Sequence, residues 1–503
     1  MKKTLFLTLL LFFACDGGDL LPRAPQNGGE AKKCLPEQRH FLGRGINLGN
    51  WLEAPRWSLQ YGQASSWGVK IETRDFENIA ERGFENIRIP ARFSDYLTQD
   101  GRVSSDFMQK LRWAVNQTVD RGMIAIIDVH HFEQMNNNPQ AYFATLKKIW
   151  EDIALEFADY DNSKVFFELL NEPHGALTPE LWNQYSAALI NQIRESNPCR
   201  PILLGTADWG GFSALSALNI PDDGNLIITL HYYNPMQFTH QGADWTPGGL
   251  TWLGTRWTGT VPEKLSVKND FEQVAEFARQ RNLRIHIGEF GAYNPAQYED
   301  RVLWTRYIAE LCNHFGFAHS YWEYSAGFGA FNPQTRQWRE ELTDALFSTE
   351  AVTDTDYRLA QTNIIRNPNF EYGLSGWTFG VWHASGEADA SANADGMNVR
   401  VTKVAVEPWG IQLLQDNLPL VAGKTYLLSF DLAGDEGMAV SVNVETYGDW
   451  IRFGATSAKA SAKNVKAVIM AQESANPVRL IFNFALSEGL AVISNVSLRE
   501  IIY

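Results

Sequence analysis

Cysteine is scarce in this sequence, with four residues among 503. No spacing between Cys15, Cys34, Cys199 and Cys312 resembles a zinc site, which argues against a structural zinc ion. Cys312 falls within a helical pattern, so we expect it to be a small buried residue. Spacing leaves open whether Cys34 pairs with another cysteine.

Positive charge is also in deficit. Lys and Arg together number 43 against 58 Asp and Glu, which gives a formal net charge of −15. That sign argues against nucleic acid or an anionic lipid surface as the main partner. Aromatic residues, in contrast, make up 13% of the chain and include 17 Trp. Trp and Tyr have flat apolar faces with a polar edge, which suits the binding of sugar rings, although a large core also uses aromatics.

Long apolar runs are also missing. Apart from the N-terminal run, no apolar run in the sequence reaches membrane-spanning length. Residues 1–15 combine a basic end, the apolar run Thr4–Phe13 and a small residue, which is the pattern of a secretory signal peptide. Cys15 after Ala14 is similar to a bacterial lipoprotein signal, in which this Cys would be lipidated, although Phe12 stands where Leu is favoured. We expect an exported protein, either secreted or a cell-surface or periplasmic lipoprotein. Residues 16–35 are polar and rich in Gly and Pro, which predicts a flexible tether.

Residues 36–350 alternate short apolar runs with amphipathic stretches of helical period. The strand-like runs are Gly43–Asn50, Phe84–Pro90, Met123–His131, Val165–Pro173, Pro201–Trp209, Asn225–Asn234, Arg284–Phe290 and Phe317–Tyr324. The helical stretches include Thr73–Arg82, Ser105–Arg121, Tyr142–Phe157, Pro179–Ser196 and Glu263–Gln280. Eight strands alternating with helices predict an α/β fold of the (β/α)8 TIM-barrel type. An open doubly wound sheet is the competing fold, but no glycine-rich phosphate turn follows the first run.

The composition changes after about Thr349. Residues 351–363 are mixed and polar, which predicts a linker. Residues 364–503 contain mostly alternating stretches, separated in part by turn signals: Tyr426–Leu432, Met438–Glu445, Ala467–Met470, Val478–Phe484 and Ala491–Leu498. This pattern predicts a second, all-β sandwich domain.

Polar and aromatic side chains stand at the carboxyl ends of the predicted barrel strands. In the fourth run, Pro173 stops the strand and leaves Asn171 and Glu172 at its tip. The corresponding residues of other runs are Asn50, Arg88, His130, His131, His231, Tyr233, Glu289 and Trp322. The carboxyl ends of parallel barrel strands share one face, so we expect these side chains to meet there.

Two carboxylates with such neighbours predict glycoside hydrolysis. One carboxyl has to be protonated and the other ionised, so their environments must separate their pKa values. Arg88 beside one carboxylate would lower its pKa, and Tyr233 could donate a hydrogen bond to the same group. Asn171 could bind a sugar hydroxyl, and Trp322 could form the floor under a sugar ring.

Structural roles compete with these assignments. Arg88 could form an ion pair that only stabilises the fold, and Trp322 could be ordinary packing. Glu168 and Glu323 are further acidic candidates. His130 and His131 could be a metal pair, but adjacent strand residues point to opposite faces, so we expect no metal there.

Six motifs carry a resemblance to glycoside hydrolase family five, the cellulase family. They are Arg44–Asn50, Ile87–Pro90, Asp128–His131, Leu170–Pro173, His231–Pro235 and Ile287–Gly291, in this order. The resemblance implies a retaining hydrolase that needs no cofactor or metal for catalysis. It implies that Glu172 is the acid/base and Glu289 the nucleophile. It also places Arg88, His130, Asn171, His231, Tyr233 and Trp322 in the active site.

Two stretches, Leu48–Pro55 and Phe238–Trp245, resemble the branch of bacterial endoglucanases that also cleave mannans. In that branch, the residues that touch substrate would be Asn50, Glu53, His131, His240 and Trp245. Trp51 replaces the small residue typical of the branch, and Arg56–Ser66 looks like an enlarged loop. Both differences lie near the expected cleft and bear on the preference between glucan and mannan.

The C-terminal segment resembles β-sandwich carbohydrate-binding modules, through Asn367–Glu371 with Gly376-Trp377 at its start and Ile493–Leu498 at its end. Such modules often hold a structural calcium ion, although Asn495 stands where Asp is commoner. The candidate sugar platforms are Trp382, Trp409, Tyr447 and Trp450, whereas Trp377 is the first choice for the core. A sandwich that only packs on the barrel is the alternative.

We therefore expect a monomeric, exported endo-β-1,4-glucanase that acts on plant-type β-glucan through a double displacement. Its substrates would be cellulose or mixed-linkage glucan. A β-mannanase or xyloglucanase on the same scaffold is one alternative. A polysaccharide-binding lipoprotein with an inactive barrel is another.

Overall fold

The computed structural model describes residues 42–352, 357–435, 437–448, 451–460, 462–471 and 477–502. The expected signal peptide, lipidated Cys15, tether and Cys34 lie outside the described residues, as does the candidate platform Trp450.

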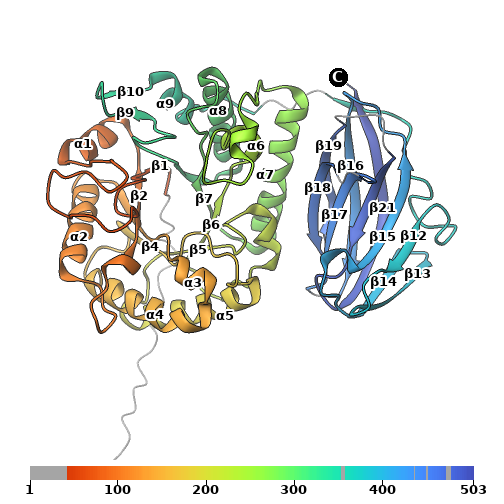
Figure 1. Ribbon diagram of the computed structural model, residues 1–503, viewed down its shortest axis with the longest axis horizontal. Helices are drawn as coiled ribbons and strands as arrows, with labels where there is room; N and C mark the ends of the chain where they lie inside the picture. The colour runs from red at the N-terminus through yellow and green to blue at the C-terminus, as the bar shows by residue number, and fades with distance from the viewer. Residues whose placement is uncertain are drawn as a thin grey trace, which may run out of the picture. The chain divides into compact units, whose positions relative to one another are not determined.

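Eight parallel strands close into a barrel in chain order, β1 to β8, with β1 pairing β8. They are β1 (Arg44–Asn47), β2 (Asn86–Ala91), β3 (Ile124–Val129), β4 (Val165–Glu168), β5 (Ile202–Gly205), β6 (Leu226–His231), β7 (Ile285–Glu289) and β8 (Ala318–Tyr321). Figure 1 shows the helices on the outside of this ring of strands. The predicted TIM barrel is confirmed, and an open sheet is excluded.

Helices alternate with these strands. They are α1 (Thr73–Arg82), α2 (Ser105–Val119), α3 (Glu133–Asn137), α4 (Pro139–Glu156), α5 (Pro179–Ser196), α6 (Met236–Thr239), α7 (Val261–Arg281), α8 (Tyr298–Phe315) and α9 (Glu340–Leu346). Local sequence sets their ends. Thr178 caps α5 by accepting the N–H of Leu181, and Pro179 supplies a first-turn residue that needs no donor. α1 ends at Gly83, whose φ of 96° suits glycine.

Short elements complete the barrel domain. They are the 3-10 helices η1 (Phe93–Tyr96), η2 (Phe212–Ala217) and η3 (Gly249–Trp252), and the hairpin strands β9 (Phe331–Asn332) and β10 (Gln337–Trp338).

The strands end earlier than the apolar runs predicted. β4 stops at Glu168, although the run continues to Pro173. Leu169 and Leu170 are buried all the same, because the backbone still bonds to the neighbouring strands: the N–H of Leu169 donates to the carbonyl of Leu203, and that of Asn171 to the carbonyl of Val129. Asn171 and Glu172 therefore lie in a loop just beyond β4, whereas His231 and Glu289 are the last residues of β6 and β7.

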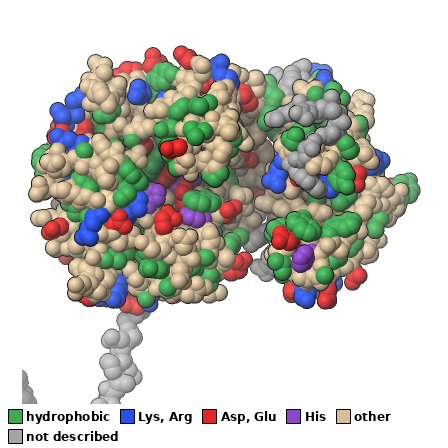
Figure 2. Space-filling model, viewed as in Figure 1, with side chains coloured by type: hydrophobic (Ala, Val, Ile, Leu, Met, Phe, Trp, Pro, Cys, Tyr) green, Lys and Arg blue, Asp and Glu red, His purple; other side chains and the backbone are tan. Residues whose placement is uncertain are grey.

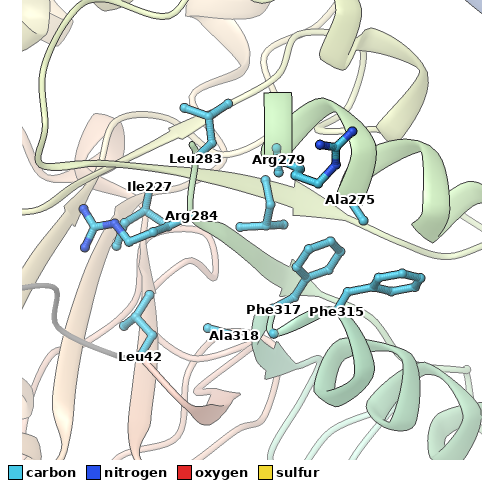
Figure 3. Close-up of a pocket in the computed structure, with 12 residues that line it drawn as sticks. Leu42, Ile227, Ala275, Arg279, Leu283, Arg284, Phe315, Phe317 and Ala318 are labelled. Carbon is cyan, nitrogen blue, oxygen red and sulfur yellow. The ribbon is translucent and has the colours of Figure 1, made fainter. Parts of the chain in front are cut away.

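The opposite end of the barrel holds a cavity of about 260 Å³. Its wall contains Leu42 before β1, Ile227 in β6 and Ala318 at the start of β8. Figure 3 shows mainly apolar side chains around it, together with Arg279 and Arg284. No carboxylate, His or Cys is among its lining residues. This cavity therefore lacks the groups that hydrolysis needs.

The C-terminal domain is a sandwich of two antiparallel sheets, β13-β14-β21-β16-β19 and β12-β15-β20-β17-β18. The strands are β11 (Arg358–Leu359), β12 (Thr378–Val381), β13 (Glu387–Asn393), β14 (Gly396–Lys403), β15 (Ile411–Leu418), β16 (Thr425–Gly434), β17 (Ala439–Thr446), β18 (Arg452–Lys459), β19 (Ala462–Met470), β20 (Val478–Asn483) and β21 (Gly489–Ile502), and the 3-10 helix η4 is Pro408–Gly410. The predicted sandwich is confirmed. β11 lies inside the predicted linker and pairs with β21, because a strand of two residues leaves no alternating pattern in the sequence.

Buried apolar side chains of both sheets form the core of the sandwich. Trp377 is 6% exposed and packs on Phe370 and Phe482, which confirms its prediction as a core residue. Cys312 in the barrel is buried, also as predicted, and it is a free cysteine. Among the described residues, no helix is both long and apolar enough to cross a membrane.

Candidate active site

Arg88 contacts several polar side chains at the carboxyl end of the barrel. β2 is buried along its whole length, and the Arg88 side chain is fully buried inside the barrel. The guanidinium donates two hydrogen bonds of 2.8 Å to Glu168, one from Nε and one from Nη2. It also donates to Asn47, Asn171 and Glu289. A planar five-donor group satisfied in this way is held rigidly, which orients each partner.

Glu289 ends β7 and receives two of the expected contacts. Arg88 Nη1 donates to its Oε1 at 2.7 Å, and the Tyr233 hydroxyl donates to its Oε2 at 2.9 Å. The Gly291 that follows allows close approach of β8, since a Cβ there would lie 2.1 Å from the carbonyl oxygen of Trp322. The motif thus has two parts: Glu289 supplies the carboxylate, and Gly291 leaves room for the backbone of Trp322.

Glu172 lies beyond β4 with a φ of 46°. Its Oε1 is 2.7 Å from Nδ1 of His231, and the same nitrogen is 3.6 Å from Oε2 of Glu289. His231 therefore stands between the two carboxyls. Oxygen atoms of Glu172 and Glu289 and a nitrogen of His231 all lie within 4.8 Å of one another. Retaining glycosidases need carboxyls about 5 Å apart, whereas inverting enzymes need a wider gap for a water molecule.

The environments of the two carboxyls differ. Burial raises the pKa of Glu172 to about 7. Burial also raises the pKa of Glu289, but only to about 6, because His231, Arg88 and the Tyr233 hydroxyl favour its ionised form. Burial lowers the pKa of His231, and the charge of the neighbouring Glu289 opposes that shift. Glu172 is consequently the carboxyl that retains its proton longer.

His130 and Trp322 lie beside this pair. The two rings are nearly parallel, 6° apart, with centroids separated by 5.7 Å, and Nδ1 of His130 lies within hydrogen-bond distance of Asp128. The prediction that His130 and His131 point apart was wrong, since their rings meet edge to face at 4.4 Å. The reason is that β3 ends at Val129, and His131 has a φ of 50°, so strand alternation no longer applies.

Asn50 and Glu53 lie in the loop after β1. Asn50 is half-buried, but Glu53 is completely buried and accepts the backbone N–H groups of Asn50 and Trp51. Burial raises the pKa of Glu53 to about 8. The structure thus places Glu53 beneath Asn50, where it fixes the loop, rather than on the surface of the cleft.

His240 and Trp245 lie in the loop after β6. The His240 ring meets that of Tyr233 edge to face at 4.8 Å, and burial lowers its pKa to about 4. Trp245 is 58% exposed and contacts Tyr293. In Figure 2, His and acidic side chains gather near the middle of the visible barrel face.

Sequence reasoning missed part of the site. Glu168 was considered only as another acid, and Asp128 only as part of a motif, yet both contact Arg88 inside the barrel. Trp209 was also missed. It is 56% exposed, with a φ of 63°, and stacks on His174 at 3.4 Å between centroids. Trp209 ends the fifth predicted run, so its position at a strand tip was the available signal.

Hydrogen bonds already engage the atoms of Glu172, His231 and Glu289 that a metal ion would use. Among the described residues, these form the only group of three His, Cys, Asp or Glu side chains close enough to share one. Both oxygens of Glu289 already accept hydrogen bonds, and His231 faces Glu172 through Nδ1. The group is better explained as a carboxyl pair bridged by an imidazole.

The three described candidate platforms of the sandwich lie at two different ends of one sheet. Trp382 and Trp409 are 53% and 49% exposed and lie at one end of the β12–β15 sheet, where the Trp382 N–H donates to the carbonyl of Gly410. Tyr447 lies at the other end, after Thr446. Ser441 and Thr446 are five residues apart on β17, which corresponds to about 17 Å. The guanidinium of Arg479 covers the Tyr447 ring at 4.1 Å.

A calcium ion in this domain remains a prediction. Asn495 presents its amide N–H to Asp431 at 2.7 Å rather than an oxygen ligand. Calcium prefers oxygen donors, so this contact does not favour a calcium site at Asn495.

Comparison with known families gives two matches. Residues 49–327 match the cellulase family, glycosyl hydrolase family 5, and residues 362–487 match a carbohydrate binding domain.

Individual relatives agree with the first match. Endoglucanase H of Acetivibrio thermocellus is 31% identical over 316 residues, which are 61% of this chain and 33% of that protein. This chain therefore matches about a third of the length of that relative.

Solved structures of Thermotoga maritima Cel5A, in complex with mannotriose and with cellobiose, are 37% identical to this chain. Each has a TM-score of 0.59 and covers 62% of this chain and 99% of the other.

Proposed function

Because the chain belongs to glycosyl hydrolase family 5, and is a hydrolase of the endoglucanase type, we propose that it cleaves β-1,4-linked glucan with retention of configuration. The observation that carries this proposal is the pair Glu172 and Glu289, with oxygen atoms within 4.8 Å and pKa values raised to about 7 and about 6. A protonated and an ionised carboxyl at this separation are what a double displacement requires.

In the first step, the Glu289 carboxylate attacks the anomeric carbon while the glycosidic bond breaks and Glu172 protonates the departing oxygen. In the second step, Glu172 removes a proton from water, the resulting oxygen attacks the anomeric carbon, and the bond to Glu289 breaks. Tyr233 and Arg88 stabilise the Glu289 carboxylate before attack and after its release. His231 lies between the two carboxyls, with Nδ1 2.7 Å from Glu172 and 3.6 Å from Glu289.

Mannan is the second candidate substrate. It is supported by the likeness to Cel5A, whose solved complexes include both mannotriose and cellobiose. The purified chain should be assayed side by side on mixed-linkage glucan, substituted cellulose, mannan and xyloglucan, with Glu289→Ala as the background. Fastest release of reducing ends from the two glucans supports a glucanase. Fastest release from mannan would make the enzyme a mannanase, and fastest release from xyloglucan would make it a xyloglucanase. Binding of these polysaccharides without release of reducing ends from any of them would contradict a catalytic role.

The C-terminal domain is proposed to hold the enzyme on the polymer, which raises the local substrate concentration. Its match to a carbohydrate binding domain and the two exposed rings of Trp382 and Trp409 support this role.

Export is also proposed, with Cys15 as a lipid attachment site. The signal-like N-terminus supports it, and so does Cys199, which is disulfide-bonded, since disulfides persist in oxidising compartments. Radiolabelled palmitate should be incorporated by the wild type but not by Cys15→Ala. Equal labelling of both would contradict lipidation at this residue.

A further inference from the structure

Trp67 is an exposed aromatic residue in the loop between β1 and α1. Trp67 is 44% exposed, and its ring meets that of His131 edge to face, with the two centroids 5.7 Å apart. The guanidinium of Arg92 lies 5.6 Å from its centroid. A partly exposed Trp ring offers a flat apolar face with a polar edge, which suits stacking on a sugar ring.

Trp67 continues a row of rings that starts at the reaction centre. Trp322 donates its backbone N–H to the carbonyl of Phe290, the neighbour of Glu289. His130 lies parallel to Trp322, His131 meets His130 at 4.4 Å, and Trp67 meets His131. The row runs from the floor beside the nucleophile outward along the β1–β3 side of the barrel mouth.

The position of Trp67 is fixed by a buried hydroxyl. Ser65 is 6% exposed, and its Oγ donates to the carbonyl of Asn50 at 2.7 Å. The same oxygen accepts the backbone N–H groups of Trp67 and Val69, both at 3.2 Å. Asn50 is itself an expected substrate contact. A ring held by this arrangement is ordered before any ligand arrives, which lowers the entropy cost of binding.

The enlarged part of the loop has its own anchor on α2. The ammonium of Lys110 lies 5.5 Å from the Trp51 ring, 5.8 Å from that of Tyr61 and 4.8 Å from that of Trp113. Tyr61 also meets Trp113 edge to face. Trp51 stands where the related branch has a small residue, so the enlarged loop and this aromatic cage belong together. Cation–π contacts of a desolvated ammonium stabilise such a site appreciably.

We propose that Trp67 is a further substrate-binding residue, which stacks on a sugar unit of the chain beyond the one that reacts. The inference rests on the proposed hydrolase function. It predicts that Trp67 contributes to long substrates only, because a short substrate does not reach it.

The test compares Trp67→Ala and Trp67→Phe with the wild type on cellohexaose and on an aryl cellobioside. We expect kcat/KM of Trp67→Ala to fall about tenfold on cellohexaose and to stay unchanged on the aryl cellobioside, as the loss of one apolar ring face implies. Trp67→Phe should recover part of the loss. Tyr61→Ala, which opens the Lys110 cage, should give a smaller loss with the same dependence on length.

Leu155→Ala is the matched control, because Leu155 is 62% exposed near the carboxyl end of α4 and should change neither value. Equal losses on both substrates would assign Trp67 a structural role, and no loss on either would remove it from the site. Either result overturns the inference while the proposed function stands. A wild type inactive on both substrates would instead overturn the proposed function and the inference with it.

Discussion

The mouth of the barrel and the β12-β15-β20-β17-β18 sheet of the sandwich both carry exposed polar and aromatic groups, but they organise them differently. In the barrel, side chains from five other strands, β1, β3, β4, β6 and β7, reach Arg88 or the two carboxyls around it, because parallel strands in a closed ring share one carboxyl end. In the sandwich, antiparallel strands send the candidate rings to opposite ends. Closure of the barrel thus brings the reactive side chains together at one place, whereas the sheet distributes its aromatic side chains over an extended surface.

The difference also appears in how tightly the groups are held. Arg88 is fully buried, with hydrogen bonds to four side chains. On the sandwich sheet, Gln412, Asn483 and Ser441 form a short row of hydrogen-bonded polar groups, and Trp382 and Trp409 stand exposed at its end. Rigid burial suits a reaction, and exposure suits reversible binding to a polymer. Four variants test this contrast, from the largest expected effect to the smallest.

Glu289→Ala should remove almost all hydrolysis. With no nucleophile the covalent step is lost, and we expect kcat to fall by about 10⁴-fold or more on soluble glucan. The measurement is release of reducing ends at saturating substrate. Binding to insoluble polymer should persist, since the sandwich is untouched. Residual activity near the wild-type value would contradict the role of Glu289 as the nucleophile, and with it the contrast between barrel and sandwich.

Glu172→Ala should slow hydrolysis by about 10²- to 10⁴-fold on natural glucan, because general acid catalysis contributes that much. An aryl cellobioside with a good leaving group needs less protonation, so its glycosylation step should be slowed much less. Pre-steady-state release of the aryl group separates this step. An equal loss on both substrates would show that Glu172 does not protonate the leaving group.

Tyr233→Phe should shift the pH profile. The Tyr233 hydroxyl favours ionised Glu289, whose pKa is raised to about 6, so its removal raises that pKa further. The acid limb of kcat/KM then moves to higher pH, while the alkaline limb, set by Glu172 near 7, stays in place. The optimum should become narrower, with activity at pH 5 falling about tenfold for each pKa unit. An unchanged acid limb would contradict the contact.

The double substitution Trp382→Ala and Trp409→Ala should have the smallest effect on chemistry. We expect weaker binding to insoluble cellulose, by about tenfold, from the loss of two exposed rings. Turnover of soluble oligosaccharides should not change. Tyr447→Ala is the matched comparison and should weaken binding less, because Arg479 already covers that ring. A larger effect of Tyr447→Ala would move the binding surface to the other end of the sheet.

The same contrast explains what the sequence could predict. Eight apolar runs with polar ends were enough for the barrel, and strand tips were enough to bring Glu172, Glu289, His231 and Tyr233 together. The contacts of Arg88 with Glu168 and Asp128 could not be predicted from the sequence, because they depend on which side chains point inward from neighbouring strands. The approach of His130 to His131 depended on a residue with positive φ just after β3.

Prediction was weaker in the sandwich for a physical reason. Residues 364–503 contain several exposed aromatic residues at turns, and the sequence does not show which turns lie at the same end of a sheet. Pairing of β12, β15, β20 and β17 separates Trp382 and Trp409 from Tyr447. Antiparallel register is set by long-range pairing, which a single sequence does not reveal.

The central claim is that Glu289 attacks and Glu172 carries the proton. Azide added to small-side-chain variants tests it most directly, with aryl cellobioside as substrate and proton NMR to identify the product. Glu289→Gly should give the α-cellobiosyl azide, because azide replaces the missing nucleophile on the opposite face. Glu172→Gly should give the β-cellobiosyl azide, because azide then replaces water in the second step. The reverse assignment of the two products, or no rescue of either variant, would contradict this mechanism.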